Sequence, residues 1–260
     1  MSHCGLRGIA EPENCALPHA TQEASPLKKR LFKSLSAQSA RTVRVRKHCN
    51  VYTCGDADQN IYWIQSGYIK IAVSSTDGKE CILDIYATGD FFGEACLAGR
   101  ELRAETATAM ESSILRSVDC QRFTAGLGPT ELLTLSQELA RRNTKQQMII
   151  ADMVTMSSEL RLGRTLLRLG SDLGKRHSSG TLIHCRISQD ELSCIVGTTR
   201  PRITEFMTKF RRLDLIHLNA DRQIIVKEDK LMTYLSALAQ DRFSDSGPIL
   251  DRPQVLKKRS

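Results

Sequence analysis

The segment SQDELSCIVGTTRPRITEFMTKFRR, residues 188–212, carries the strongest local signals in the chain. Ser188 and Glu191 form the pattern of a capping box, in which each side chain accepts a hydrogen bond from a backbone N–H at the start of a helix. Gly197 can take the left-handed conformation that ends such a helix. A second helix then begins at one of the two threonines that follow. Two short helices joined by a glycine turn predict a helix–turn–helix.

The second helix combines a basic start with an apolar inner face. An arginine near the start of a helix can donate two hydrogen bonds to guanine, and threonine hydroxyls and terminal N–H groups can bind phosphate. We therefore predict that this helix lies in the major groove of double-stranded DNA. The alternative is an ordinary basic surface helix. The predicted inward residues are Ile203, Phe206, Met207 and Phe210. The residues assigned to DNA contact are Ser188, Thr198, Thr199, Arg200, Arg202, Thr204, Glu205 and Lys209.

Segments on either side of this pair complete a winged helix–turn–helix domain, which we assign to residues 158–235. A leucine-rich helix is expected over residues 159–176, before a short β run. The apolar runs 216–218 and 224–226, separated by a polar turn, predict a two-stranded wing. Residues 158–228 hold thirteen Lys and Arg against eight Asp and Glu. The excess positive charge is densest here, where an anionic polymer could bind.

Residues 43–118 have a different pattern, in which short β-rich runs alternate with regularly spaced glycines. Many short strands with even turn signals indicate a small β-barrel or sandwich. Asp77-Gly78 is typical of a hairpin turn, because glycine accepts the positive φ of such a turn. From Pro129 the pattern becomes helical, with no further glycine or proline until Gly163. The expected fold class of the chain is therefore α+β.

The helix that begins at Pro129 repeats apolar side chains with a seven-residue period. Such a seam is typical of a coiled coil, and its two polar central positions, Arg142 and Gln146, are unusual for a helix packed only within one domain. We therefore predict a homodimer joined through the dimerisation helix, residues 129–157. The alternative is a long helix that packs on its own domain. The residues assigned to the dimer interface are Leu132, Leu135, Leu139, Ile149, Met153 and Met156.

The composition is that of an ordinary globular protein, with 260 residues, 41% hydrophobic and 25% charged residues, and a net charge of +8. No apolar run could span a membrane, and residues 1–26 lack the apolar core of a secretory signal, so a cytoplasmic location is expected. Residues 1–26 are expected to form a flexible tail and residues 236–260 a polar tail. No catalytic arrangement of side chains stands out, so we do not expect an enzyme.

The nine cysteines include no C-x-x-C pair, which gives little support for a metal or iron–sulfur site. Most of them are expected to be buried free thiols. A cysteine-based redox switch that uses Cys49 and Cys54, or Cys96, is the alternative for this group of residues.

A second motif with chemical content lies within the β-rich region, where Phe92-Gly93-Glu94 is followed by Arg103-Ala104. A glycine beside a helix start frees backbone N–H groups for an anion, and a glutamate can accept a hydrogen bond from a sugar hydroxyl. An arginine can form a bidentate pair with a phosphate. Taken alone, such a pattern is more often a turn with a surface charge.

Together these parts resemble the Crp-Fnr family of bacterial transcription regulators, over residues 27–235. The matching motifs are the glycine–glutamate and arginine–alanine pairs above, Leu139-Ala140-Arg141-Arg142 in the long helix, and the helix–turn–helix. The resemblance implies a cyclic-nucleotide-binding-type β-roll (jelly roll) at residues 27–128, followed by the dimerisation helix and the winged domain. It also implies a pseudo-palindromic DNA site, with RNA polymerase as a further partner.

In the cyclic-AMP-binding members of this family, the Gly-Glu…Arg segment holds the ribose and the cyclic phosphate. The resemblance implies that Glu94 binds the ribose 2′-hydroxyl, that Arg103 binds the phosphate, and that Arg142 pairs with Glu94. Cyclic AMP or a related anionic effector is the implied ligand. The residues assigned to effector binding are Gly93, Glu94, Ala95, Arg103, Ala104, Arg142, Gln146 and Gln147.

The sequence departs from the family pattern at both sites. Ala104 replaces a serine of the bacterial cyclic-AMP receptor, and Gln146-Gln147 replace its adenine-binding Thr-Ser pair. Pro201 and Glu205 stand where family members commonly have base-reading residues, so the DNA site should differ from the usual consensus. An effector-independent regulator is therefore a competing interpretation. A competing structural interpretation of the motif is that Arg103 pairs with Glu94 or Glu105 inside an empty roll.

Overall fold

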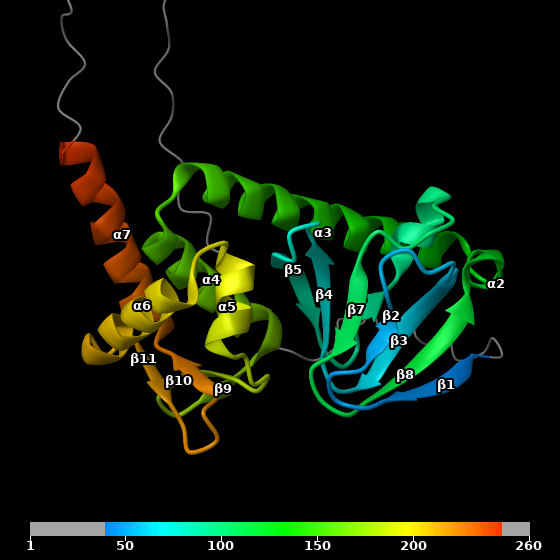
Figure 1. Cartoon of the computed structure of the whole chain (residues 1–260), viewed down its shortest axis with the longest axis horizontal. Helices are drawn as coiled ribbons and strands as arrows, with labels where there is room; N and C mark the ends of the chain where they lie inside the picture. The colour runs from blue at the N-terminus through cyan, green and yellow to red at the C-terminus, as the bar shows by residue number, and fades with distance from the viewer. Residues whose placement is uncertain (1–39, 246–260) are drawn as a thin grey trace, which may run out of the picture.

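The computed structural model describes residues 40–245. A β-roll and a helical domain lie at opposite ends of the molecule, and one long helix runs along both, as Figure 1 shows with the roll on the right. The α+β fold class is thereby confirmed. The tail assigned to residues 1–26 lies outside the described residues. Within the described part, no helix is long and apolar enough to cross a membrane.

The β-roll consists of two four-stranded antiparallel sheets, with the strand orders β1-β8-β3-β6 and β2-β7-β4-β5. The hairpin turn predicted at Asp77-Gly78 connects β4 to β5, with Gly78 at a φ of 81°. The strands are β1 (Arg41–Val45), β2 (Asn50–Tyr52), β3 (Asn60–Ser66), β4 (Ile69–Ser74), β5 (Glu80–Tyr86), β6 (Phe91–Phe92), β7 (Thr106–Ala109) and β8 (Ser113–Asp119).

Strand β3 is buried on both of its faces, and it separates two apolar clusters. Successive side chains of a strand point to opposite sides. Ile61 and Trp63 therefore pack in one cluster with α2 (Cys120–Ala125), whereas Tyr62 and Ile64 pack in the other, between the two sheets. All four side chains are at most 6% exposed.

Helix α3 (Pro129–Thr155) begins with the proline that the sequence analysis placed in its first turn. Its 27 residues extend about 40 Å at 1.5 Å per residue, enough to pass along the whole roll. One face of α3 is buried against the roll, where Leu135 is 6% and Arg142 is 5% exposed. The short 3-10 helix η1 (Glu94–Ala98) lies on the roll in the same region.

The opposite face of α3 exposes apolar side chains, some in the predicted seam and some one residue beside it. Leu133, Ile150 and Val154 are 60%, 63% and 80% exposed. Leu132 and Met153, assigned to the dimer interface, are also exposed, at 46% and 37%. Leu135, assigned with them, packs instead in the core of its own roll, so that assignment is wrong. Leu139 is half-buried against the same core. The seven-residue period of apolar residues in the sequence could not show which face of α3 packs against the roll.

The winged domain has three helices packed on one small sheet, with the strand order β11-β12-β10-β9. The predicted wing is present as β11 and β12, and the predicted β run is the second strand of a hairpin. Leu166, Ile203 and Phe210 are fully buried at its centre. The elements are α4 (Ser158–Leu173), β9 (Gly174–His177), β10 (Gly180–Ile183), α5 (Gln189–Val196), α6 (Arg200–Arg212), β11 (Ile216–Leu218) and β12 (Ile224–Val226).

A further helix, α7 (Glu228–Asp245), occupies part of the segment that we assigned to a polar tail from residue 236. Its Leu231 is fully buried and Leu235 is 7% exposed. Gly163 of α4 lies against Leu235, where a Cβ atom would collide with the leucine side chain. The winged domain therefore extends beyond residue 235, and only residues 246–260 of the assigned tail lie outside the described part.

The roll and the winged domain share one apolar cluster, because α5 packs against β5. Ile82 of β5 and Leu192 of α5 belong to this cluster, and both are at most 3% exposed. Lys145 of α3 lies 2.8 Å from Asp84 of β5 and 2.7 Å from Asp172 of α4. One ammonium group therefore connects the roll, the long helix and the winged domain.

Candidate functional site

The capping box predicted from the sequence is present at the start of α5. Ser188 Oγ accepts a hydrogen bond from the N–H of Glu191 over 3.1 Å, and the Glu191 carboxylate accepts one from the N–H of Ser188 over 2.9 Å. Helix α5 ends at Gly197 with a φ of 66°, and α6 begins at Arg200 after an extended Thr199. The start of α5 and the glycine turn after it are therefore decided locally, whereas α6 begins at Arg200, just after the two threonines at which we expected it.

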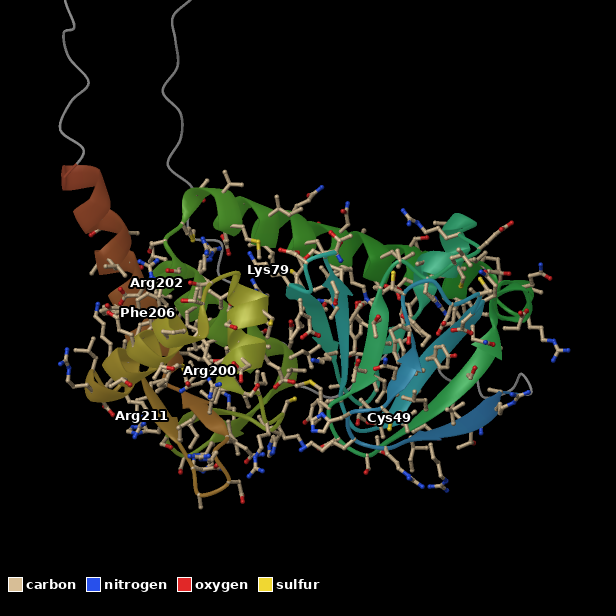
Figure 2. The ribbon with its side chains drawn as sticks, in the orientation of Figure 1. Cys49, Lys79, Arg200, Arg202, Phe206 and Arg211 are labelled. Atoms are coloured by element: carbon tan, nitrogen blue, oxygen red, sulfur yellow. The ribbon has the colours of Figure 1, made fainter. Side chains whose placement is uncertain are left out.

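Helix α6 has one buried and one exposed face, as predicted. The predicted inward residues Ile203, Phe206, Met207 and Phe210 are each at most 9% exposed. Most residues assigned to DNA contact lie on the exposed face, among them Arg200, Thr204 and Glu205. Figure 2 labels Arg200, Arg202 and Arg211, all of which come from α6. This face presents guanidinium and hydroxyl groups, which suit base edges and phosphates.

Arg211 extends the exposed face of α6 and was not among the residues assigned to DNA contact. It is exposed and lies eleven residues after Arg200. Residues 200, 204, 208 and 211 follow one another at spacings of three or four, so they share one side of the helix. That spacing could have identified Arg211 from the sequence.

The first turns of α5 and α6 hold each other's side chains in place. Arg200 Nη1 lies 3.3 Å from Asp190 Oδ2, and both side chains are more than 60% exposed. Thr204 Oγ1 donates to Gln189 Oε1 over 2.7 Å. Exposed ion pairs of this kind are weak. Arg200 can therefore exchange Asp190 for another acceptor at little cost.

Two other residues assigned to DNA contact lie against α4. Arg202 Nη1 donates to Ser158 Oγ over 3.3 Å, and Lys209 Nζ lies 2.7 Å from Glu159 Oε1. Hydrogen bonds with Glu159 and Tyr234 raise the pKa of Lys209. The charge of Lys209 is already paired with Glu159, which differs from the DNA contact to which we assigned it.

Arg103 is buried in the roll, and protein groups satisfy its guanidinium. Only 3% of the residue is exposed. Its Nε and Nη2 donate to Oδ2 of Asp58 over 3.2 and 2.8 Å, and Nη1 donates to the carbonyl of Gly93 over 2.7 Å. The internal partner is therefore Asp58, and neither Glu94 nor Glu105 is its ion-pair partner. Sequence analysis missed Asp58 because it lies 45 residues upstream, outside any motif.

Arg142 connects α3 to the roll, and its predicted contact with Glu94 is present. Arg142 Nη1 lies 2.7 Å from Glu94 Oε1, Nε lies 3.0 Å from Glu138 Oε1, and Nη2 donates to the carbonyl of Phe91 over 2.8 Å. Burial would lower the pKa of Arg142, but the neighbouring Tyr86, Glu94 and Glu138 raise it overall. The arginine therefore keeps its charge, and it also lies 4.5 Å from the ring centre of Tyr86.

Aromatic rings fill the space between the two buried arginines. Tyr62 and Phe92 stack with their centres 5.2 Å apart, and Tyr86 stacks on Phe92 at 6.5 Å. Tyr52 lies 5.9 Å from Tyr62, and the guanidinium of Arg103 covers its ring at 4.1 Å. Stacked aromatic pairs and cation–π contacts stabilise this packing.

The remaining residues assigned to effector binding are divided between the roll and the solvent. Gly93 is buried with a φ of 86°, and a Cβ atom there would lie 2.8 Å from the carbonyl oxygen of Asn60. Ala95 is half-buried, whereas Ala104 is exposed. Gln146 and Gln147 of α3 are also exposed. The structure thus brings Glu94 and Arg142 together, and it leaves the glutamines on the outer side of α3.

Three of the described cysteines are buried, two are half-buried, and Cys49 and Cys54 are exposed. Burial raises the pKa of the Cys96 thiol to about 12, and a hydrogen bond with the neighbouring Cys120 adds to this effect. A thiol with such a high pKa stays protonated and is a poor nucleophile. Cys4 and Cys15 lie outside the described residues. Among residues 40–245, no cluster of His, Cys, Asp and Glu is arranged to hold a metal ion.

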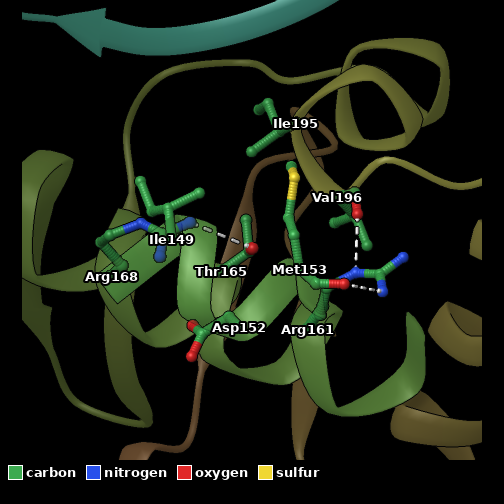
Figure 3. A pocket seen from close by; sticks show the side chains of 8 residues that line it. All are labelled: Ile149, Asp152, Met153, Arg161, Thr165, Arg168, Ile195 and Val196. Carbon is green, nitrogen blue, oxygen red and sulfur yellow. Dashed lines mark hydrogen bonds between the residues drawn. The ribbon is translucent and has the colours of Figure 1, made fainter. Parts of the chain in front are cut away.

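A small cavity lies where α3, α4 and α5 meet, as Figure 3 shows. Its volume of about 10 Å³ is close to the space of one water molecule. Arg161 lies beside it, and donates from Nε to the carbonyl of Val196 over 3.0 Å and from Nη1 to the carbonyl of Met153 over 3.4 Å. This arginine connects the ends of all three helices, and the cavity is too small for an effector.

Two family models match the chain, one for each domain. The cyclic nucleotide-binding domain matches residues 42–127, and the Crp-like helix-turn-helix domain matches residues 160–234. The first range coincides with the β-roll, and the second begins in α4 and ends in α7.

Curated relatives are similar over both domains. A CRP-like cAMP-activated global transcriptional regulator of Mycobacterium tuberculosis is 24% identical over 183 residues, which cover 70% of this chain and 82% of the relative. The cAMP-activated global transcriptional regulator CRP of Pasteurella multocida is 27% identical over 184 residues, which cover 65% of this chain and 86% of the relative.

Solved structures share the fold. The c-di-GMP responsive global regulator CLP of Xanthomonas campestris has a TM-score of 0.65 at 20% identity, with 76% of this chain and 99% of that chain covered. FixK2 of Bradyrhizobium japonicum has a TM-score of 0.66 at 17% identity, with 75% and 96% covered. Both likenesses concern the architecture alone.

Proposed function

This chain belongs to the Crp-Fnr family of transcription regulators, and from this premise we propose that it binds double-stranded DNA sequence-specifically as a homodimer. The observation that carries the proposal is the exposed face of α6, which presents Arg200, Thr204 and Arg211 beyond a fully packed inner face. Helix α6 of each copy would lie in the major groove. The proposal places the protein in the cytoplasm, with RNA polymerase as a further partner.

The exposed side of α3 supports the homodimer. Leu133, Ile150 and Val154 lie on it at spacings that place them along one stripe, with the small Ala140 and the polar Gln147 between them. A two-helix coiled coil buries such a stripe, and a central polar residue fixes the register of the pair. A second copy of α3 would cover the same residues on both chains, as two-fold symmetry requires.

For the β-roll, the first candidate is a domain that binds a small effector such as a cyclic nucleotide. The match to the cyclic nucleotide-binding domain supports it, as do the relatives named as cAMP-activated. The carboxylate of Glu94 lies beside Arg142 of α3. A ligand that forms a hydrogen bond with Glu94 would therefore act directly on the contact between the roll and the long helix.

The second candidate is a roll that controls the regulator without a cyclic nucleotide, and a specific contact favours it. Asp58 already supplies the anion that Arg103 would otherwise take from a phosphate. Aromatic rings fill the space beside this pair. Cys49 and Cys54, exposed near the start of the roll, leave a redox-controlled version open.

Selection of bound sequences from a random DNA pool tests the proposal. We expect a pseudo-palindrome whose half-sites lie about one helical turn apart, because the two recognition helices of a two-fold dimer meet the same face of the duplex. The selection is repeated with and without cyclic AMP, which separates the two candidates for the roll. Binding to a single half-site by a monomer would contradict the homodimer.

A further inference from the structure

We propose that Asp58 is a built-in counter-anion of Arg103, and that this residue makes the β-roll reject cyclic nucleotides and other anionic effectors. The inference rests on the proposed function only in treating the roll as the regulatory domain. It concerns the ligand specificity of that domain, which the family assignment leaves open.

The guanidinium of Arg103 has little capacity left for a ligand. An arginine carries five N–H donors. Asp58 accepts from Nε and Nη2, the carbonyl of Gly93 accepts from Nη1, and the carbonyl of Asn60 accepts from Nη2. The ring of Tyr52 lies against one side of the group, with its centre 4.1 Å from Arg103 Cζ. Asp58 occupies the Nε–Nη2 edge of the guanidinium, which could otherwise donate two hydrogen bonds to a phosphate.

Asp58 is itself fixed in place. Its Oδ1 accepts from the side-chain nitrogen of Asn60 over 2.5 Å, and its Oδ2 accepts from the hydroxyl of Tyr62 over 3.1 Å. Only 16% of its side chain is exposed. The loop that carries it is attached to Arg103 through the backbone, because the N–H of Arg103 donates to the carbonyl of Asp56 over 2.9 Å. The ion pair is therefore part of a hydrogen-bonded unit, unlike a chance surface contact.

The surrounding backbone is shaped for this arrangement. Gly93 takes a left-handed conformation, and a Cβ atom in its place would lie 2.8 Å from the carbonyl oxygen of Asn60 and 3.1 Å from Nη2 of Arg103. Burial would lower the pKa of Arg103, but Asp58 raises it overall. Arg103 therefore stays charged, and the carboxylate of Asp58 lies 2.8 Å from Nη2 at the place where a cyclic phosphate would need a positive partner.

A tethered carboxylate competes with a free ligand at a high local concentration. The apparent affinity of Arg103 for a phosphate is its intrinsic affinity multiplied by the fraction of molecules in which Arg103 is not paired with Asp58. Removal of Asp58 should therefore create an anion site that the natural chain lacks. The cost is an unpaired buried arginine, so the variant should be less stable until an anion binds.

The test uses the full chain and three probes, cyclic AMP, cyclic GMP and inorganic phosphate. Calorimetry with the natural chain should give no binding heat for either nucleotide. The Asp58→Ala variant should melt at a lower temperature, and each probe should raise that temperature. Its affinity for cyclic AMP should exceed that of the natural chain at least about tenfold. Addition of Arg103→Ala to this variant should abolish the gain.

Asp56→Ala is the matched control, because Asp56 is an exposed carboxylate of the same loop whose side chain accepts from the N–H of Thr53. It should leave nucleotide binding unchanged. If Asp58→Ala does not fold, Asp58→Asn replaces it, since the amide keeps the shape and removes the charge. The same gain is then expected, only smaller.

Micromolar binding of cyclic AMP by the natural chain, lost on Arg103→Ala, overturns the proposal. So does a folded Asp58 variant whose melting temperature no anion raises. DNA binding is measured separately on the same samples. A chain that fails to bind DNA contradicts the proposed function without touching the result for Asp58.

Discussion

Arg103 and Arg142 are both buried at the β-roll, but their ion-pair partners lie in different parts of the molecule. Arg103 pairs with one carboxylate inside the roll. Arg142 comes from α3 and lies between Glu94 of the roll and Glu138 of its own helix. A movement of the Glu94 carboxylate therefore alters an ion pair with the helix that we propose as the dimer seam. The ion pair of Arg103, in contrast, joins two residues of the roll.

Arg142→Ala should destabilise the protein by about 3–5 kcal/mol, because it removes a buried guanidinium that pairs with Glu94 and donates to the carbonyl of Phe91. Urea unfolding followed by circular dichroism measures this loss. Arg141→Ala is the control, since Arg141 also pairs with Glu138 but its side chain is 53% exposed. Its cost should stay below about 1 kcal/mol. Equal losses for the two variants would show that burial does not decide the energetics here.

Arg200→Ala should cost about 1–3 kcal/mol at one base pair of the DNA site and relax the preference there. Arg211→Ala should weaken binding to all sequences alike, because an exposed arginine at the far end of α6 suits a phosphate. Fluorescence anisotropy with a set of single-base variants of the site separates the two. Lys209→Ala should have little effect on DNA affinity, because Glu159 already pairs with Lys209. A uniform loss for Arg200→Ala would assign that residue to the backbone instead.

At the scale of elements, the bounds of α5 and the inner face of α6 could be predicted from the sequence, whereas the face of α3 could be predicted only in part. The capping box and Gly197 gave the bounds of α5, because a cap is decided within a few residues. On α3, Leu132 and Met153 are exposed as predicted and Leu135 is not, because both sides of the helix carry apolar residues and only packing decides which side meets the roll. Helix α7 was missed, although Leu231 and Leu235 already have helical spacing.

Ile150→Glu should convert the dimer to monomers without unfolding the roll. Ile150 is 63% exposed on the outer side of α3, so the glutamate clashes with its symmetry mate only in a paired helix. Sedimentation velocity measures the change in mass. Leu102→Glu is the control, because Leu102 is an exposed leucine of the roll, outside α3, and its variant should remain dimeric. A dimeric Ile150→Glu variant would place the interface elsewhere.

At the scale of the molecule, the ligand site was harder to predict than the order of the domains. The motifs around Glu94 and Arg103 correctly indicated a cyclic-nucleotide-binding type of roll. The ion-pair partner of Arg103 could not be predicted from these motifs, because Asp58 lies in a loop 45 residues upstream. The contact of α5 with β5 is equally non-local, and it joins the two domains into one apolar cluster.

Because this shared cluster and the ion pairs of Lys145 act together, the described part of the chain should unfold in a single calorimetric transition. Lys145 adds a polar link, since its ammonium lies between Asp84 of the roll and Asp172 of the winged domain. Lys145→Met removes that charge and leaves the two carboxylates facing each other. We expect the transition to split into two, with faster hydrogen exchange in α5 and β5. Lys230→Met is the control, because Lys230 pairs with Asp214 inside the winged domain and should lower the melting temperature without splitting the transition. If Lys145→Met still unfolds in one step, the apolar contact of α5 with β5 is sufficient to couple the domains.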